Sequence, residues 1–242
     1  MIVLDAGTKY IHNYLIPIGD EFCLIDTGYK WSYEAFMKRL KKINVRPESI
    51  KYIFITHMHA DHRGFLNEYL SHYSPTLIYD VDDKKRLEAG KNDLNTFIST
   101  FYFLVTSKIT AGALMVNKMQ ICPAVFYDKF IDAKKQPLLE YGVRFIALQG
   151  HTEHDTVLLY DGKCYCGDLC GSGVCGSHKF PMWLKDKYEL LRSWDKIIGL
   201  DGITEICPSH GDSFKIGELA VEKEYWLQKG VFRLFKKNKS LV

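Results

Sequence analysis

The chain has 242 residues, of which 47% are hydrophobic and 25% are charged, and its formal net charge is +3. These fractions are typical of a globular protein with a substantial buried core, and they exclude an intrinsically disordered chain. A net charge of +3 without a strongly basic stripe does not indicate a nucleic-acid partner. We therefore expect a small-molecule substrate or ligand rather than a nucleic acid.

The sequence gives no sign of a membrane or secreted protein. Its N-terminus lacks the basic stretch and long apolar run of a signal peptide. Seven cysteines, an odd number, favour free thiols and a cytoplasmic location. The most apolar segment, residues 94–107, has 14 uncharged residues, whereas a transmembrane helix needs roughly 20. We predict no membrane span, and the sequence does not indicate an oligomeric state.

The first third of the chain alternates strand and helix patterns. Gly19 and Asp20 separate two apolar runs and predict a β-hairpin, whose second run ends at Thr27 and Gly28. The next predicted elements, in order, are a helix at 32–43 with Ser32 as its N-cap, a strand at 49–56, a helix around 65–70 and a strand at 76–80.

The rest of the chain continues this mixture. The hydrophobic pattern of residues 81–140 predicts a mainly helical insertion. After it we expect strands at 142–148, 155–160 and 163–167, a helix at 187–200, a strand at 205–207 and a last helix at 215–229. Without an internal repeat or a clear linker, this order predicts one α/β domain over residues 1–242.

Residues 54–65, FITHMHADHRGF, place three histidines and an aspartate where a strand passes into a helix. Two histidines spaced by two positions after a strand, His57 and His59, can point the same way and hold one metal ion. Asp61 and His62 follow as the chain turns. Nitrogen and oxygen donors without a thiolate suit zinc, iron or manganese. Histidines exposed at a helix start are the simpler alternative, but four ligand-type residues within six positions favour a metal site.

Three further ligand-type residues follow predicted strands. His151 comes after the strand at 142–148, Asp168 after the cysteine-containing strand, and His210 after the last strand. Because each stands in a loop at a strand end, the three side chains can converge on one edge of a sheet. Together with the first cluster they predict a site for two metal ions.

This pattern resembles the metallo-β-lactamase superfamily, from the sequence IDTG at 25–28 to PSHG at 208–211. The resemblance implies an αββα sandwich of the α/β class, with the metals at one edge of two sheets. It assigns His57, His59 and His151 to the first metal, and Asp61, His62 and His210 to the second. Asp168 would bridge the two metals. Asp26 would orient a ligand through a hydrogen bond.

The resemblance implies a hydrolase with two divalent metal ions, with zinc expected and iron or manganese as alternatives. Two such ions lower the pKa of a shared water, and the hydroxide bridging them attacks a carbonyl carbon. His57, His59, Asp61 and Asp168 are the residues expected to serve catalysis. A thioester, an ester or a lactone with an apolar group is the expected substrate. The alternatives are a small-molecule phosphodiesterase, a metal-binding sensor, a di-iron redox protein and a β-lactamase.

The ligand set resembles those of glyoxalase II and the acyl-homoserine lactonases, but neither assignment is complete. Cys175, Gly176 and the pair Lys179-Phe180 partly match a glyoxalase II loop. The stretch between His62 and His151 is longer than in glyoxalase II, however, and the stretch after the last histidine is shorter. The tyrosine that lactonases carry after the bridging aspartate is absent, because Leu169 follows Asp168.

Several other features have both a structural and a functional interpretation. The aromatic residues of the 81–140 insertion, such as Phe101 and Phe103, fit a packed helical pair or a lid over an apolar pocket. His154 and Asp155 are candidates for contact with a ligand or for donating a proton, and His178 is a candidate for substrate contact. The four cysteines of residues 164–175 are expected to be small buried side chains, with a separate zinc site as the alternative; they are Cys164, Cys166, Cys170 and Cys175.

Overall fold

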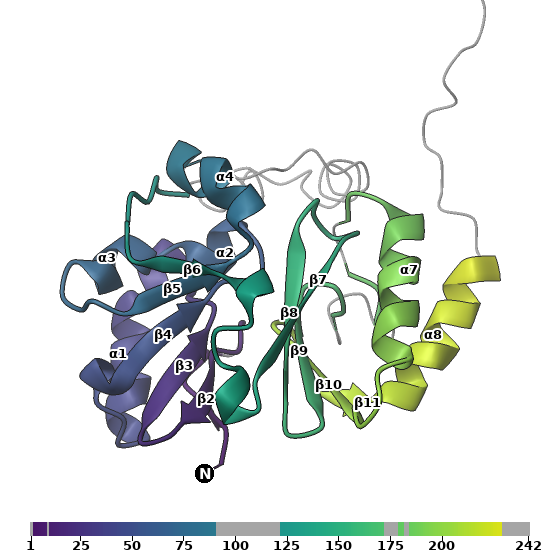
Figure 1. Ribbon diagram of the computed structural model, residues 1–242, viewed down its shortest axis with the longest axis horizontal. Helices are drawn as coiled ribbons and strands as arrows, with labels where there is room; N and C mark the ends of the chain where they lie inside the picture. The colour runs from purple at the N-terminus through teal and green to yellow at the C-terminus, as the bar shows by residue number, and fades with distance from the viewer. Residues whose placement is uncertain (1, 9, 91–121, 172–178, 182–183, 229–242) are drawn as a thin grey trace, which may run out of the picture.

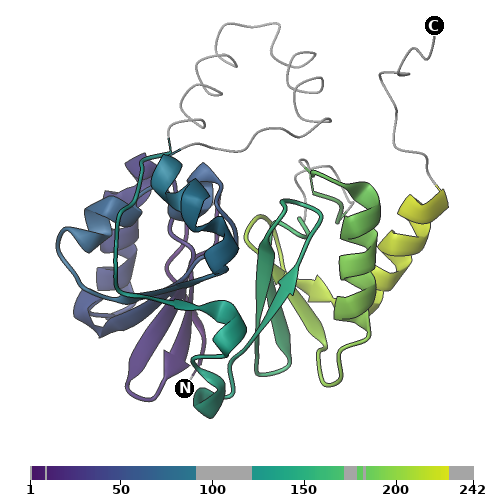
Figure 2. The ribbon, with the colours of Figure 1, turned by 45° about the horizontal axis from the view of Figure 1, so that its top comes forward.

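The computed structural model describes residues 2–8, 10–90, 122–171, 179–181 and 184–228 of the chain. Two β-sheets face each other at the centre of the molecule, and helices cover the outer side of each sheet (Figure 1). The view in Figure 2, with the top turned forward, shows the same four-layer order. The expected αββα sandwich is therefore confirmed.

The first sheet has six strands in chain order. The first three strands are antiparallel neighbours, and from the third to the sixth all neighbours are parallel. Their bounds are β1 (Leu4–Asp5), β2 (Tyr14–Ile18), β3 (Glu21–Ile25), β4 (Ile50–Phe54), β5 (Thr76–Tyr79) and β6 (Phe130–Asp132).

The second sheet has five strands in the order β11-β10-β9-β8-β7. Only β9 and β10 are parallel, and the register between them shifts at Pro208. The bounds are β7 (Arg144–Leu148), β8 (Asp155–Tyr160), β9 (Lys163–Gly167), β10 (Glu205–Pro208) and β11 (Phe214–Lys215).

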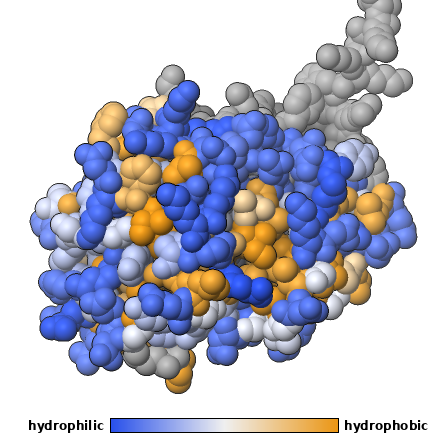
Figure 3. All heavy atoms as spheres, in the orientation of Figure 1, coloured by the Kyte–Doolittle hydropathy of each residue, from blue (hydrophilic) through white to orange (hydrophobic). Residues whose placement is uncertain are grey.

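The outer layers are helical. The first sheet carries α1 (Tyr33–Lys42), α2 (Ala60–Arg63), α3 (Leu66–Leu70) and α4 (Lys84–Ala89), and the second carries α7 (Lys187–Ile198) and α8 (Ile216–Gln228). Short 3-10 turns are η1 (Lys30–Ser32), η2 (Pro47–Ser49), η3 (Val81–Asp83), η4 (Ala133–Lys135) and η5 (Leu139–Tyr141). Among the described residues no helix is both long and apolar enough to cross a bilayer. The face drawn in Figure 3 mixes hydrophilic and hydrophobic residues.

The core lies in three layers, and the strands explain this. Successive side chains of a strand point to opposite faces, so a strand covered on both sides is apolar throughout. In β3, Leu24 packs in the cluster under the helices of the first sheet, whereas Cys23 and Ile25 pack between the two sheets. Phe145 and Tyr165 of the second sheet complete this middle layer. A third cluster lies under α7 and α8 and includes Trp194.

Most predicted elements are present, with three differences. The hairpin at Gly19 is formed, with this glycine at φ +62°. Ser32 stands before α1 but does not cap it, because its hydroxyl donates to the carbonyl of Tyr29 at 2.8 Å. The predicted helical insertion is wrong at its end: Phe130–Asp132 form β6, which pairs with β5. The two-residue strands β1 and β11 were too short to predict. Residues 91–121 of the insertion, with Phe101 and Phe103, lie outside the described residues.

Candidate metal centre

The predicted site residues follow the carboxyl ends of strands from both sheets. Asp26 follows β3 and His57 follows β4 in the first sheet, while Asp168 follows β9 in the second. The backbone joins the two sheets at this edge, where the amide of Thr156 donates to the carbonyl of Thr56 at 2.9 Å. Parallel strand ends and this contact explain why residues far apart in sequence meet.

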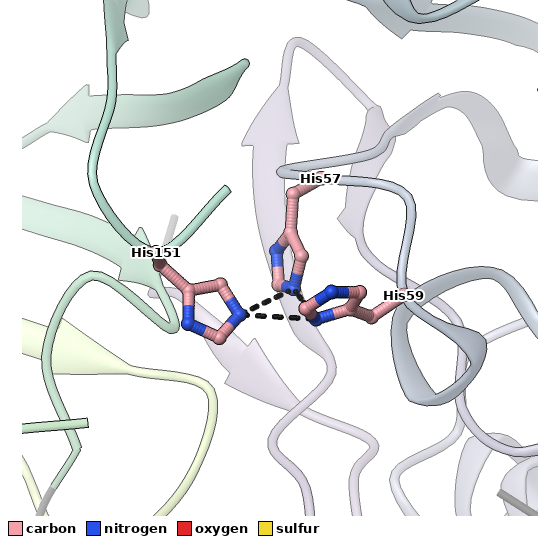
Figure 4. Close-up of side chains that lie close together, drawn as sticks. All are labelled: His57, His59 and His151. Atoms are coloured by element: carbon pink, nitrogen blue, oxygen red, sulfur yellow. Dashed lines mark hydrogen bonds between the residues drawn. The ribbon is translucent and has the colours of Figure 1, made fainter. Parts of the chain in front are cut away.

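His57, His59 and His151 form the first cluster of ligand-type side chains. Figure 4 shows the three imidazoles pointing toward one another, two from the loop after β4 and one from the second sheet. His151 Nε2 lies 3.2 Å from His57 Nε2 and 3.0 Å from His59 Nδ1, and the latter two nitrogens lie 3.1 Å apart. All three side chains are buried.

These spacings fit a metal ion. Three nitrogens bound tetrahedrally to one zinc at its usual bond length would lie roughly 3.3 Å apart. The observed separations of 3.0–3.2 Å are close to that value. Because a neutral imidazole has one N–H group, three nitrogens that converge on one point cannot all donate to one another. A bound cation would give these three nitrogens a common partner.

Burial keeps two imidazoles of the first cluster neutral, those of His57 and His59. It lowers the pKa of His57 well below its usual 6.5, and the imidazoles of His62 and His151 lower this pKa further. Burial and the His151 imidazole also lower the pKa of His59 to about 3. Deprotonated rings keep a nitrogen lone pair available, as binding to a metal requires.

Asp61, His62, Asp168 and His210 form the second cluster. His210 Nε2 lies 3.2 Å from Asp61 Oδ2 and 3.6 Å from Asp168 Oδ1. His62 Nε2 lies 3.5 Å from Asp168 Oδ2 and 3.7 Å from Asp61 Oδ1. The geometry leaves His62 Nε2 and Asp168 Oδ1, both buried, without a hydrogen-bond partner among the described residues. Buried polar atoms are normally satisfied, so these two atoms fit the ligands of a cation.

The second cluster is charged. Burial alone would raise the pKa of Asp168, but the imidazoles of His210 and His62 hold it well below its usual value. Burial likewise opposes ionisation of Asp61, and the same two imidazoles lower its pKa. Burial would lower the pKa of His210, yet Asp168 and Asp61 raise it to about 9. The carboxylates are therefore ionised, and their charge favours a cation at this position.

Asp168 lies between the two clusters. Its Oδ2 is 3.7 Å from His151 Nε2 of the first cluster and 3.5 Å from His62 Nε2 of the second. The rings of His57 and His62 are also in contact, with their centroids 3.9 Å apart. The two clusters are thus contiguous, and one carboxylate reaches both.

Asp26 makes the hydrogen bond that the resemblance predicted. Its Oδ2 lies 2.7 Å from His62 Nδ1 and accepts from Thr56 Oγ1 at 2.8 Å. The Thr56 hydroxyl in turn lies 3.0 Å from His57 Nδ1. One buried carboxylate therefore orients a histidine of each cluster, directly in one case and through a hydroxyl in the other.

The other two histidines are held by the backbone. His210 Nδ1 makes a hydrogen bond with the carbonyl of Tyr10, which fixes Nε2 toward Asp61. The carboxylate of Asp155 accepts from the amides of His151 and Thr152 at 3.0 and 2.9 Å. Asp155 therefore shapes the loop that presents His151.

The remaining predicted residues lie elsewhere. His154 groups with Asp80 and Asp82, which also bind the Lys134 ammonium at 2.7 and 2.6 Å, and not with either cluster. His178 and Cys175 lie outside the described residues. The other three cysteines of the group are buried in the core, as predicted, and no metal-ligand group among the described residues includes them; they are Cys164, Cys166 and Cys170.

Three residues around the site were not predicted from the sequence. Thr56 links Asp26 to His57, and Tyr29 donates its hydroxyl to Asp61 Oδ2 at 3.2 Å. The sequence offered one signal for each residue: Thr56 directly precedes His57, and Tyr29 directly follows the IDTG sequence. The buried Arg63 donates to four carbonyls, including that of Met58 between the two histidines. Its position directly after His62 does not distinguish it from an exposed arginine.

The fold and the two clusters define an αββα protein with a candidate dinuclear metal site at the edge of its sheets. Residues 6–110 match the model of the family described as the metallo-beta-lactamase superfamily. This match, the fold and the HxHxDH sequence of residues 57–62 make the chain similar to the members of that superfamily.

Solved structures of this superfamily have the same fold. An archaeal metallo-beta-lactamase superfamily protein, ST1585 from Sulfolobus tokodaii, is 19% identical with a TM-score of 0.63, and the match covers 95% of this chain and 85% of that one. The family protein TTHA1429 from Thermus thermophilus is 17% identical with a TM-score of 0.64, over 93% and 79% of the two chains. TTHA1623, solved in a di-iron-bound form, is 19% identical with a TM-score of 0.63, over 91% and 97%.

Proposed function

We propose that this protein is a dinuclear metal-dependent hydrolase that attacks the carbonyl carbon of a thioester, an ester or a lactone. The observation that carries this proposal is the position of Asp168, whose carboxylate reaches both clusters of ligand-type side chains. Two cations that share a carboxylate form the kind of centre that activates water and stabilises an oxyanion.

The two clusters suit different parts of such a centre. His57, His59 and His151 would hold one ion through their ring nitrogens, and Asp61, His62, His210 and Asp168 would hold the other. When bound, the two ions supply Lewis acidity and lower the pKa of water. The chain's own contribution is to orient the ligands, because Asp26 and Thr56 fix the ring nitrogens that face the ions.

The charge of the site supports acyl transfer. The neutral imidazoles of His57 and His59 line one side, so the positive charge of an ion there would be only partly compensated. Such a site favours a transition state in which negative charge develops on a substrate oxygen. His57, His59, Asp61 and Asp168 would thus serve catalysis as ligands, and zinc is the proposed metal. The nitrogen and oxygen donors also suit iron, and the similar protein TTHA1623 was solved with two iron ions.

Metal analysis of the purified protein, combined with a panel of substrates, tests the proposal. The panel contains thioesters, lactones, aryl esters, phosphodiesters and a β-lactam. We expect two equivalents of metal and turnover of at least one of the first three classes, lost on chelation and restored by zinc. Turnover of only phosphodiesters or only the β-lactam would overturn the proposal that the substrate is a thioester, an ester or a lactone. Bound iron with oxygen consumption, or bound metal without turnover of any substrate, would overturn the proposal that the protein is a hydrolase.

A further inference from the structure

An aromatic pair adjoins the second cluster. Tyr29 follows the IDTG sequence, and its hydroxyl donates to Asp61 Oδ2 at 3.2 Å. The same oxygen lies 3.2 Å from His210 Nε2. The Tyr29 ring stacks on the indole of Trp31, with centroids 4.2 Å apart and planes 10° from parallel. A continuous line of contact therefore runs from a candidate metal ligand to the indole.

The outer member of this pair is open to solvent. Trp31 is 58% exposed, although tryptophan is usually largely buried. An isolated exposed aromatic residue is ordinary on a protein surface. Trp31 differs because it stacks on Tyr29, whose hydroxyl contacts Asp61, so a single ring separates Trp31 from a residue of the second cluster. We call Tyr29 and Trp31 together the aromatic platform.

The loop that carries the platform is held tightly against α2. The amide of Thr27 donates to the carbonyl of His62 at 2.7 Å. A Cβ atom on Gly64 would lie 2.6 Å from both the carbonyl oxygen of Gly28 and the amide of Lys30, so glycine is needed there for the two segments to approach. The platform therefore has a fixed position relative to the two α2 residues of the second cluster.

We propose that the aromatic platform binds a planar aromatic group of the substrate, and that the Tyr29 hydroxyl positions Asp61. This inference rests on the proposed function and makes the substrate class more specific. A third aromatic ring that packs on a stacked pair in an offset or edge-on arrangement adds favourable interaction free energy. A phosphate or a short alkyl group would gain little binding free energy from that surface. The expected substrate is therefore a carbonyl compound that carries an aryl group.

The test separates the two residues. Isothermal titration of the zinc-loaded protein with phenylacetate and with acetate measures binding of a ring without turnover. For Trp31→Ala we expect a Kd for phenylacetate at least fivefold higher, with the Kd for acetate within twofold of the native value. Phe126→Ala is the matched control, because Phe126 is 75% exposed and adjoins Tyr127, whose hydroxyl donates to Pro75 before the start of β5.

Tyr29→Phe keeps the ring and removes the hydroxyl. We expect this variant to bind phenylacetate as the native protein does, while one of its two zinc equivalents binds severalfold more weakly in a chelator competition. For Trp31→Ala we expect native zinc affinity. A phenylacetate affinity unchanged in Trp31→Ala, or no preference for phenylacetate over acetate, would overturn the platform. Unchanged zinc affinity in Tyr29→Phe would overturn the positioning of Asp61.

These outcomes are distinct from those that test the hydrolase. A protein that binds phenylacetate through Trp31 but hydrolyses nothing in the panel would overturn the proposed function and support the platform. If the protein is an active hydrolase and its KM values for phenylacetyl and acetyl thioesters rise equally in Trp31→Ala, the proposed function is supported and the platform is overturned.

Discussion

The carboxylate of Asp26 and the imidazole of His62, both fully buried, lie 2.7 Å apart. Because this contact occupies Nδ1, the other ring nitrogen, Nε2, faces Asp61 and Asp168. A histidine ligand is usually oriented by such a partner on its second nitrogen. Asp26 is therefore expected to control the metal affinity of the second cluster without touching the metal.

Replacing this carboxylate tests that expectation. In Asp26→Asn, one oxygen that accepts from Thr56 or contacts His62 becomes an NH₂ group, which cannot accept. We expect one of two zinc equivalents to bind roughly 10–100-fold more weakly. Competition with a chromophoric chelator measures the change. Asp128→Asn, which alters an exposed carboxylate before β6, is the control, and equal zinc affinities in the two variants would contradict the role of Asp26.

Asp168 is expected to be essential for both metals. Asp168→Ala removes the carboxylate that lies near His151 and His62 and leaves those buried imidazoles without its charge. We expect hydrolytic activity to be lost and the metal content to fall below two equivalents. Elemental analysis of the purified variant, with a steady-state assay, measures both. If the variant kept two metals and full turnover, Asp168 would not be a bridging ligand.

Gly167 has a role that the sequence did not indicate. It adopts φ +56°, and a Cβ atom there would lie 2.7 Å from the hydroxyl oxygen of Thr56. Gly167→Ala is therefore expected to lower the free energy of unfolding by about 1–3 kcal/mol through backbone strain and displacement of Thr56. Urea denaturation measures this. Gly171→Ala is a matched control, because nothing lies within 4 Å of the Cβ position there.

A displaced Thr56 has a second consequence. Its hydroxyl links Asp26 to His57, so Gly167→Ala is also expected to weaken zinc binding at the first cluster. An alanine variant as stable as Gly171→Ala and with native zinc affinity would show that Thr56 can move without disturbing either histidine.

The sequence predicted which ligand-type side chains converge better than it predicted the contacts that support them. His57, His151 and Asp168 could be identified because ligand-type residues recur after apolar strand patterns, and the fold brings them together as expected. The hydrogen bond of Asp26 was predicted only from the family resemblance. Contacts such as that between Tyr29 and Asp61 depend on how two loops pack, which no periodicity encodes.

In the fold as well, elements with a long local pattern were predicted, whereas features that depend on tertiary contacts were not. Long apolar runs such as β8 and amphipathic segments such as α7 were predicted nearly to the residue. β6 was missed because three half-buried residues carry too short a pattern, and its place in the sheet depends on pairing with β5. His154 was placed near the metals by sequence proximity to His151, but the chain turns after Thr152 and brings it to Asp80 and Asp82.

Arg63 is expected to stabilise the loop of the first cluster. Its fully buried guanidinium donates to the carbonyls of Met58, Arg86, Leu87 and Pro123 at 3.0–3.2 Å. Arg63→Met keeps most of the side-chain volume but leaves these buried carbonyls without this donor. Since each unsatisfied group costs about 1–3 kcal/mol, the expected loss of unfolding free energy is at least about 3 kcal/mol.

Thermal and urea unfolding of Arg63→Met measure that loss. Arg39→Met is the control, because Arg39 is exposed and its Nε donates to one carbonyl, that of Gly7. A similar small loss in both variants would mean that water or a rearranged loop satisfies the carbonyls around Met58.

Asp5, at the end of β1, and His12, which precedes β2, form an ion pair whose contribution to stability should depend on pH. His12 Nδ1 lies 2.6 Å from Asp5 Oδ2, and His12 Nε2 lies 3.0 Å from the carbonyl of Gly211. The hydrogen bond to Asp5 raises the pKa of His12 above 6.5, and partial burial opposes this. Burial would raise the pKa of Asp5, but His12 holds it below 3.8.

The signs of these shifts define the pH window. A raised histidine pKa stabilises the folded state fully below pH 6.5, and this contribution is lost as pH rises through the folded-state value. A lowered carboxylate pKa stabilises the folded state above pH 3.8. This contribution is lost as pH falls through the folded-state pKa of Asp5. The pair should therefore stabilise most between about pH 4 and 6.5, by less than about 1 kcal/mol because both side chains are partly exposed.

His12→Gln removes the charge that forms this pair. We expect its unfolding free energy to differ most from that of the native protein near pH 5.5 and to approach the native value toward pH 9. Urea titrations at several pH values measure the difference, in which the titrating groups remote from His12 cancel. His72→Gln, which replaces an exposed histidine after α3, is the control. A His12→Gln difference that stays constant or grows from pH 6 to 9 would show that the imidazole acts there as a neutral hydrogen-bonding group.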